Sequence, residues 1–164
     1  MNPLEWVSSF PAEWAVFFLS MLPLTELRAA IPIGLKVYNL PVLTTWIFAV
    51  LGNALPTVFI LFFMPRLHDW FIKQKFFGNV VKKKLLKAEK AFSGNFAKYG
   101  AIALILFVGI PLPMTGAWTG SLAAFIFKIP FKKAFPLIFA GICVAATFVT
   151  ALTLFAGGAF NSIR

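Results

Sequence analysis

Residues 42–64 read VLTTWIFAVLGNALPTVFILFFM, a run of 23 residues without a charged side chain. A helix of this length extends about 35 Å, which exceeds the ~30 Å hydrocarbon core of a bilayer. A second run of 26 residues, at 135–160, reads FPLIFAGICVAATFVTALTLFAGGAF and is also uncharged. We therefore predict two transmembrane helices, over 42–64 and 135–160.

The composition of the whole chain agrees with this prediction. Of its 164 residues, 60% are hydrophobic, 17% are aromatic and 12% are charged, and the mean hydropathy is +0.89. One small core cannot bury so much apolar surface. The sequence predicts an integral membrane protein and excludes a soluble enzyme. Residues 1–22 lack an early Lys or Arg and a small-residue cleavage site, so we expect them in the mature protein.

Two further apolar stretches are interrupted. Residues 14–24 run into Thr25-Glu26-Leu27-Arg28 and resume at 29–35, and residues 101–110 break at 111–116 and resume at 117–127. Each arm holds about 7 to 11 residues, which covers about half of a membrane. We therefore expect two re-entrant helical hairpins, each of which enters and leaves the membrane on one side.

The two halves of the chain repeat each other at a spacing of about 90 residues. With one single-residue gap, the repeat aligns Pro23 with Pro113, Pro41 with Pro130, and Gly52 with Gly141. Internal duplication recurs among transporters. The expected fold class is an all-α integral membrane protein with an inverted repeat of a re-entrant hairpin plus a transmembrane helix, and a basic amphipathic helix between the halves.

The basic residues gather between the two repeats. The chain carries 15 Lys and Arg against five Asp and Glu, and eight of the lysines lie within 66–98. Val81, Leu85, Ala88 and Phe92 recur there at helical spacing, which predicts a basic amphipathic helix on the membrane surface. Because no nucleic-acid motif accompanies the charge, we expect anionic lipids as its partner, and no nucleic acid.

The charge distribution also predicts the topology and the domains. The positive-inside bias places 66–98 in the cytoplasm and both termini outside, in a multi-pass protein of the inner (cytoplasmic) membrane. The expected domains are a first repeat over 1–65, the basic segment over 66–98 and a second repeat over 99–164.

Glu26 and Arg28 are the charged residues expected deep in the membrane. Such a charge costs at least about 2.5–3.5 kcal/mol and usually marks a functional site. The alternative is a mutual ion pair that stabilises the hairpin, although residues two apart do not face each other on a helix. Burial favours a protonated carboxyl, so Glu26 suits a proton carrier. The planar fork of Arg28 suits a phosphate or carboxylate.

The second hairpin tip has a different chemistry. Pro111 and Pro113 interrupt the helical backbone of the first arm, and Gly116 permits a tight turn. The N-terminus of the second arm presents free N–H groups that can bind an anion. Alternatively, Gly116 and Gly120 form a packing face of small residues. Asn53, in the middle of 42–64, either contacts the substrate or forms a hydrogen bond between helices.

The candidate substrate-binding and coupling residues are therefore Thr25, Glu26, Arg28, Asn53, Pro111, Pro113, Thr115, Gly116, Trp118 and Thr119. We expect no catalytic residue, metal or cofactor, because the sequence holds no metal cluster, nucleotide-binding loop or pairing of a nucleophile with a base.

Two segments resemble a known family. Residues 22–34, LPLTELRAAIPIG, and residues 108–120, VGIPLPMTGAWTG, resemble the two signature segments of the small multidrug export proteins, and the resemblance covers nearly the whole chain. The layout is distantly similar to the DedA (VTT) superfamily, which implies two re-entrant hairpins and, in some members, movement of undecaprenyl phosphate or lipid scrambling. Glu26 falls near the first-hairpin acid of DedA, whereas Val108 and Met114 stand near its arginine pair.

These features predict a small transporter or exporter, proton-coupled through Glu26, for a small or amphipathic substrate that Arg28 can bind if it is anionic. The first alternative is a DedA-like lipid-phosphate flippase or lipid scramblase with a groove open to lipid. The second is a non-transporting membrane scaffold. We also expect a homodimer, because two spanning helices are few to shield two hairpins from lipid.

Overall fold

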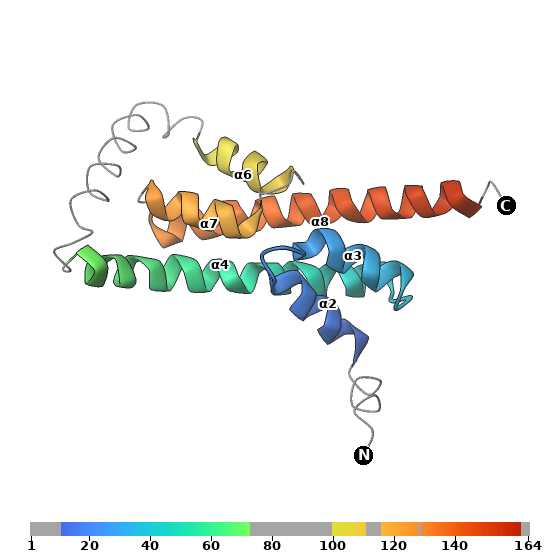
Figure 1. The fold of residues 1–164 in the computed structure, drawn as a ribbon. Coiled ribbons are helices and arrows are strands. Elements are labelled where there is room, and N and C mark those ends of the chain that lie inside the picture. The colour runs from blue at the N-terminus through green and yellow to red at the C-terminus, as the bar shows by residue number, and fades with distance from the viewer. Residues whose placement is uncertain (1–10, 73–99, 111–115, 128, 162–164) are drawn as a thin grey trace, which may run out of the picture. The chain divides into compact units, whose positions relative to one another are not determined.

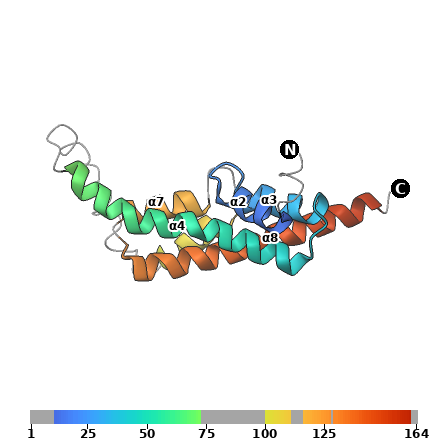
Figure 2. The same cartoon turned by 90° about the horizontal axis from the view of Figure 1, so that it is seen from below.

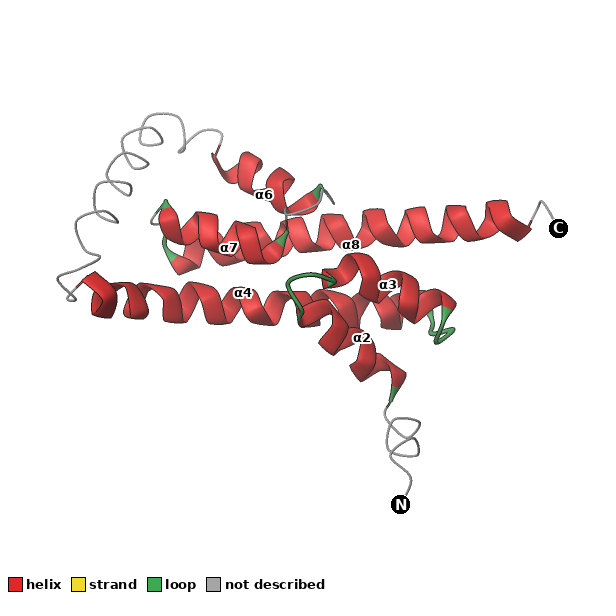
Figure 3. Cartoon of the chain, in the orientation of Figure 1, coloured by secondary structure: helices red, strands yellow, loops and turns green. Residues whose placement is uncertain are grey.

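The computed structural model describes residues 11–72, 100–110, 116–127 and 129–161, and all regular structure in these ranges is helical (Figure 3). The helices, in chain order, are α2 (Ala12–Met21), α3 (Glu26–Lys36), α4 (Val42–Ile72), α6 (Ala101–Gly109), α7 (Ala117–Ile126) and α8 (Phe131–Asn161) (Figure 1). The predicted all-α class is confirmed. Of the basic segment predicted over 66–98, residues 66–72 continue α4, and residues 73–98 lie outside the described residues.

Among the described residues, two spans are long and apolar enough to cross a membrane: Val42–Met64 in α4 and Phe131–Ala156 in α8. The first span has the predicted limits. α8 begins at Phe131, four residues before the predicted start. Pro130 precedes the helix, and its carbonyl oxygen accepts from the Lys133 and Ala134 N–H groups, both at 2.9 Å. Lys133 is exposed, so charge in the first turn does not prevent the helix from forming.

Large apolar side chains cover the outside of both long helices. Phe59 and Phe62 on α4 are 53% and 48% exposed, and Phe148 and Phe155 on α8 are 54% and 79% exposed. Contact of such a surface with water would be unfavourable, whereas contact with lipid is not. Together with the length of the two spans, these exposed side chains indicate a membrane protein.

The chain divides into two compact units, which are described separately. The first unit comprises residues 1–55 and 143–164, and the second comprises residues 56–142. Both boundaries lie inside long helices, so each unit contains two short helices and part of both α4 and α8.

In the first unit, α2 and α3 pack against each other and against α4 (Figures 1 and 2). Val16, Ala30 and Ile31 are completely buried. The Trp14 ring meets the Phe48 ring of α4 edge to face, with centroids 5.8 Å apart. This packing of rings and small side chains holds the hairpin formed by α2 and α3 on the surface of α4.

In the second unit, Val108 of α6 is the centre of the packing. Its side chain is 2% exposed and lies against Gly120 of α7 and Gly141 of α8, where a Cβ would come within 2.5 and 2.7 Å of Val108 atoms. The two arms of the second hairpin, predicted at 101–110 and 117–127, match α6 and α7 within one residue.

The first hairpin differs from its prediction at the break. The expected break at residues 25–28 lies instead at residues 22–25, and Glu26 begins α3. Pro23 explains the shift, because it disfavours helical backbone at the preceding residue, and Leu22 is extended with ψ of 138°. Glu26 then stands at a helix N-terminus, where a negative charge is stabilised by the helix dipole.

Candidate functional site

Two local hydrogen bonds fix the tip of the first hairpin, residues 22–26, which we call the first tip. The Thr25 hydroxyl donates to the Leu19 carbonyl oxygen at 2.6 Å, and the Glu26 N–H donates to the Leu22 carbonyl oxygen at 3.0 Å. Carbonyl oxygens in the last turn of a helix lack helical partners. Thr25 therefore gives the Leu19 carbonyl oxygen a second donor beside the Leu22 N–H at 3.4 Å, and it closes the turn between α2 and α3.

Glu26 has a left-handed backbone, with φ of 46°. This conformation costs a residue with a side chain about 1–2 kcal/mol, and it persists only where the surrounding structure enforces it. The residue is also 6% exposed, so its carboxyl group lies inside the unit. Backbone strain and a buried acid thus coincide at one residue.

Arg28 is paired with this acid: its Nη2 lies 3.8 Å from the Glu26 Oε2. Residues two apart on a regular helix point roughly 200° away from each other, so the pair depends on the unusual φ of Glu26. The two side chains differ in burial, with 26% of Arg28 and 8% of Glu26 exposed. The guanidinium therefore extends from a buried carboxyl toward the surface of the unit.

The packing of α3 on α4 sets the level of Asn53. The two helices are joined by residues 37–41, and a Cβ at Gly34 would lie 2.6 Å from the Thr45 Cγ2, which fixes their antiparallel register. Glu26 precedes Gly34 by eight residues, and Asn53 follows Thr45 by eight. At 1.5 Å per residue, both lie about 12 Å further along the pair. Glu26 and Asn53 are therefore at the same level.

The direction of Asn53 follows from two contacts of α4. Thr45 faces α3, and Trp46 faces α8, because its indole N–H donates to the Thr147 hydroxyl at 3.3 Å. These directions lie about 100° apart around α4, and Asn53 lies about 80° from Thr45 toward the Trp46 side. Its side chain therefore points within about 20° of the Trp46 direction, toward α8. It is 1% exposed, and its Oδ1 has no hydrogen-bond donor among the described residues.

Two close contacts join α2 to residues 49–52 of α4 and hold the first tip beside this part of α4. The Ser20 hydroxyl donates to the Ala49 carbonyl oxygen at 2.6 Å in a buried position, and a Cβ at Gly52 would overlap the Phe17 carbonyl oxygen. Sequence analysis did not single out Ser20. A lone small hydroxyl residue in an apolar helix, three residues before Pro23, was the available signal.

Part of the second hairpin tip is described. Pro111, Pro113 and Thr115 lie outside the described residues. Gly116, which directly precedes α7, has φ of 141°, a conformation open to glycine and strained for other residues. The Thr119 hydroxyl donates to the Gly116 carbonyl oxygen at 3.2 Å.

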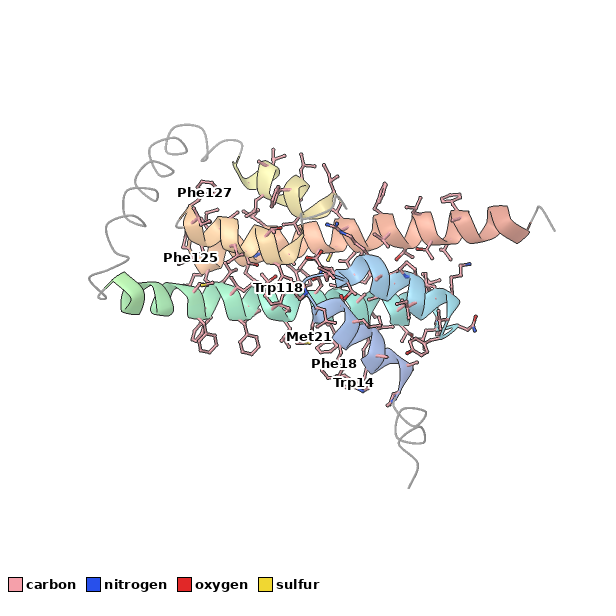
Figure 4. All side chains as sticks on the ribbon, viewed as in Figure 1. Trp14, Phe18, Met21, Trp118, Phe125 and Phe127 are labelled. Atoms are coloured by element: carbon pink, nitrogen blue, oxygen red, sulfur yellow. The ribbon has the colours of Figure 1, made fainter. Side chains whose placement is uncertain are left out.

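Trp118 and Gly120 lie further along α7. Trp118 is half-buried and projects from α7 (Figure 4). The predicted alternative of small-residue packing applies to Gly120, which is buried against Val108 and Ile138.

Thr25, Glu26, Arg28 and Asn53 thus lie in the first unit, and Gly116, Trp118 and Thr119 lie in the second. The first group joins a buried carboxyl, a guanidinium and an unpaired amide oxygen, which can bind a proton, an anionic group and a hydrogen-bond donor respectively. Within the described ranges, no group of three or more His, Cys, Asp or Glu is placed to hold a metal ion.

Comparison with protein families gives one finding. A family profile matches residues 26–148, which is more than half of the chain and includes Glu26, Arg28, Asn53 and the whole second hairpin. No curated protein and no solved structure matches the chain significantly. By the match over residues 26–148, the chain belongs to the family described as putative small multi-drug export protein.

Proposed function

We propose that the protein is a proton-coupled exporter of small amphipathic compounds. The observation that carries this proposal is the buried Glu26 carboxyl beside Arg28 at the tip of a helical hairpin. Charged groups at membrane depth are expensive, and in membrane proteins they mark substrate and proton pathways. Family membership supports export as the activity.

Each residue of the pair has its own role in this proposal. Glu26 binds and releases the coupling proton in this proposal, because a carboxyl group exists in a protonated and an ionised form. Arg28, whose side chain is partly exposed, binds an anionic group of the substrate through its planar fork. At the second hairpin tip, we propose Pro111, Pro113, Thr115, Gly116, Trp118 and Thr119 as further substrate contacts.

Re-entrant hairpins arranged as an inverted repeat would provide the framework for transport. Matching hydrogen bonds support a repeat. The Val37 N–H donates to the Ile33 carbonyl oxygen and the Phe127 N–H to the Ala123 carbonyl oxygen, both at 2.9 Å. These two bonds lie 90 residues apart, the spacing at which the sequence halves align.

The long helices support the same repeat. Gly52 of α4 lies against the backbone of α2, and Gly141 of α8 lies against α6, where a Cβ would come within 2.9 Å of the Ile105 carbonyl oxygen. In each half, the equivalent glycine thus lies where the first arm of the hairpin crosses the long helix of the same half at close distance. Because one transmembrane crossing separates the halves, the second copy is inverted with respect to the first.

The membrane topology follows from the charge distribution. We propose that residues 66–98 lie in the cytoplasm, on anionic lipids of the inner membrane, and that both termini are external. Two such chains associate as a homodimer, because non-helical backbone at membrane depth has to be covered by protein or to line a watery cavity.

A second candidate function is a lipid-phosphate flippase, which a groove in the first unit favours. The groove has a volume of about 560 Å³ and lies between α4 and α8, with an almost entirely apolar lining that includes Val42, Trp46, Thr150 and Leu154. Such a surface accepts an acyl chain readily. A flippase would use the groove for the lipid tail and Arg28 for the phosphate.

Proteoliposomes that contain trapped pyranine test these functions directly. Three probes are offered singly across a pH gradient: ethidium, anilinonaphthalene sulfonate and a fluorescent short-chain phosphatidic acid. An exporter moves a soluble probe and changes the lumenal pH together with it. A flippase moves the phosphatidic acid alone, and a scaffold moves none. Absence of movement of all three probes would contradict both transport functions.

A further inference from the structure

We propose that the groove between α4 and α8 in the first unit holds one phospholipid of the bilayer by an acyl chain, and that the Trp46 indole N–H donates a hydrogen bond to an ester carbonyl of this lipid. The lipid stays bound in this account and is not carried across the membrane. The proposal therefore applies equally to an exporter, a flippase and a scaffold.

The walls of the groove lie in the two membrane spans, Val42–Met64 and Phe131–Ala156. All of its lining residues belong to the first unit. The lining includes Leu43 and Leu154, which are 70% and 44% exposed, and the volume is about 560 Å³. A hollow apolar surface at membrane depth is surrounded by lipid, so an acyl chain is the group that fills it.

The groove carries no charge that could bind a lipid headgroup or a charged substrate. Residues 42–55 of α4 and 143–161 of α8 contain no Asp, Glu, Lys, Arg or His. A charged group would lose its hydration there without gaining an ionic partner. The uncharged part of a lipid, its acyl chains and ester groups, is therefore the complementary ligand.

Trp46 provides the hydrogen-bond donor that such a ligand can reach. The polar lining residues are Trp46, Thr147 and Thr150. Thr147 donates its hydroxyl hydrogen to the Cys143 carbonyl oxygen at 2.8 Å, and Thr150 is 7% exposed. The Trp46 indole nitrogen lies 3.3 Å from the Thr147 hydroxyl oxygen at an exposed position, beyond the usual ~2.7–3.2 Å of an N–H···O hydrogen bond. A better placed acceptor can therefore replace Thr147.

The depth of Trp46 suits a lipid ester group. Trp46 lies four residues inside the start of the Val42–Met64 span, about 6 Å along α4, and side chains on a helix lean toward its N-terminus. The indole therefore lies near the membrane interface, where tryptophan is enriched and lipid ester carbonyls are found. The backbone carbonyls of a spanning helix from a second copy are already bonded within that helix, so a lipid is the better acceptor.

Retention of lipid tests the groove. Protein in a mild detergent is washed free of loosely bound lipid, and native mass spectrometry counts the phospholipids that remain on each chain. We expect the parent protein to retain one. Ala151 lines the groove, and Ala151→Phe should lower the retained fraction about tenfold, because the added ring fills the space. The matched control is Leu152→Phe, at a 59% exposed position next to Ala151 that does not line the groove; it should retain the lipid.

Ester and ether lipids test the hydrogen bond. Delipidated protein is reloaded with an equimolar mixture of ester-linked phosphatidylcholine and its ether-linked analogue, which has the same headgroup and chain length but no carbonyl. We expect the parent protein to bind the ester lipid about fivefold better, the net effect of one hydrogen bond. Trp46→Phe should bind both lipids equally, because phenylalanine keeps an aromatic ring and lacks the N–H donor.

Three results would overturn the proposal: no phospholipid on the washed parent protein, equal retention by the parent and a folded Ala151→Phe protein, or equal binding of ester and ether lipids by the parent. If thermal unfolding shows that Ala151→Phe does not fold, the ester preference and its loss in Trp46→Phe decide the question. A lipid-free dimer that Ala151→Phe disrupts would assign the groove to a second copy instead. Retained lipid without movement of phosphatidic acid in liposomes supports the proposal and excludes the flippase function alone.

Discussion

The Nη2 of Arg28 lies 3.8 Å from the Oε2 of Glu26, although a regular helix points residues two apart in different directions. The pair forms because Glu26 has a φ of 46° at the first position of α3. A strained backbone, a buried acid and a partly exposed base therefore belong to one local arrangement, which lies where Pro23 breaks the first hairpin.

The stability of paired variants separates a functional pair from an architectural one. If the pair is purely architectural, Glu26→Gln and Arg28→Gln should each lower the free energy of unfolding by roughly 3–5 kcal/mol, and the double variant should recover it. We expect smaller losses, about 1 kcal/mol or less, because Arg28 is 26% exposed and keeps contact with its surroundings. Thermal unfolding in detergent measures all three variants. Destabilised single variants that are rescued in the double variant would assign the pair to architecture.

Arg28→Lys tests the anion contact. Lysine keeps the charge but lacks the planar fork that binds two oxygens at once. We expect slower uptake of an anionic probe with little change in melting temperature, and unchanged uptake of a cationic probe that does not use Arg28. Equal rates for both probes in the variant and the parent protein would exclude a bidentate contact.

Gly52→Ala should destabilise the first unit. The added methyl group would overlap the Phe17 carbonyl oxygen, which belongs to the backbone of α2 and cannot rotate away. We expect a loss of about 1–3 kcal/mol in the free energy of unfolding. Gly34→Ala is the matched comparison, because its methyl group meets side-chain atoms of Thr45 and Val16 that can shift. A Gly52→Ala protein that is no less stable than Gly34→Ala would contradict the close crossing.

Hydropathy alone predicted the long helices. Residues 42–64 form a span with the predicted limits, because an uninterrupted apolar run of this length has few alternatives in a membrane. The break of the first hairpin was misplaced by three residues. Polar side chains at 25–28 suggested a loop, whereas the effect of Pro23 on the preceding backbone ends α2 at Met21.

The site was predictable in its residue types and not in its geometry. Charge at membrane depth pointed to Glu26 and Arg28, and a polar amide in an apolar run pointed to Asn53. The left-handed φ of Glu26 has no local signal, because glutamate rarely adopts it. The common level of Glu26 and Asn53 depends on the register of α3 on α4, which the Gly34 contact with Thr45 determines.

Cysteine labelling tests the topology. In a Cys143→Ala background, we expect a cysteine introduced by Lys84→Cys to react with an impermeant maleimide only after the cells are permeabilised, because the positive-inside bias places this segment in the cytoplasm. The control is Tyr38→Cys, at an exposed position between α3 and α4, which should react in intact cells. Labelling of the Lys84→Cys protein from outside would reverse the proposed orientation.

The oligomeric state tests how the hairpins are covered. We expect native mass spectrometry from lipid nanodiscs to detect a dimer, because two hairpins need more protein cover than two spanning helices provide. Crosslinking in liposomes at low protein density gives an independent check. Monomers alone in both measurements would show that one chain shields its own hairpins.

Proton movement in the Glu26→Gln protein tests the central claim most directly. Parent and variant are reconstituted at equal density with trapped pyranine, and the lumenal pH is followed after addition of whichever probe the parent protein transports. Glutamine keeps the shape and hydrogen bonding of a protonated glutamate but cannot titrate. We expect the variant to fold and insert normally while the pH change coupled to the probe disappears. A stable Glu26→Gln protein that still moves protons with the probe at the parental rate would contradict the account.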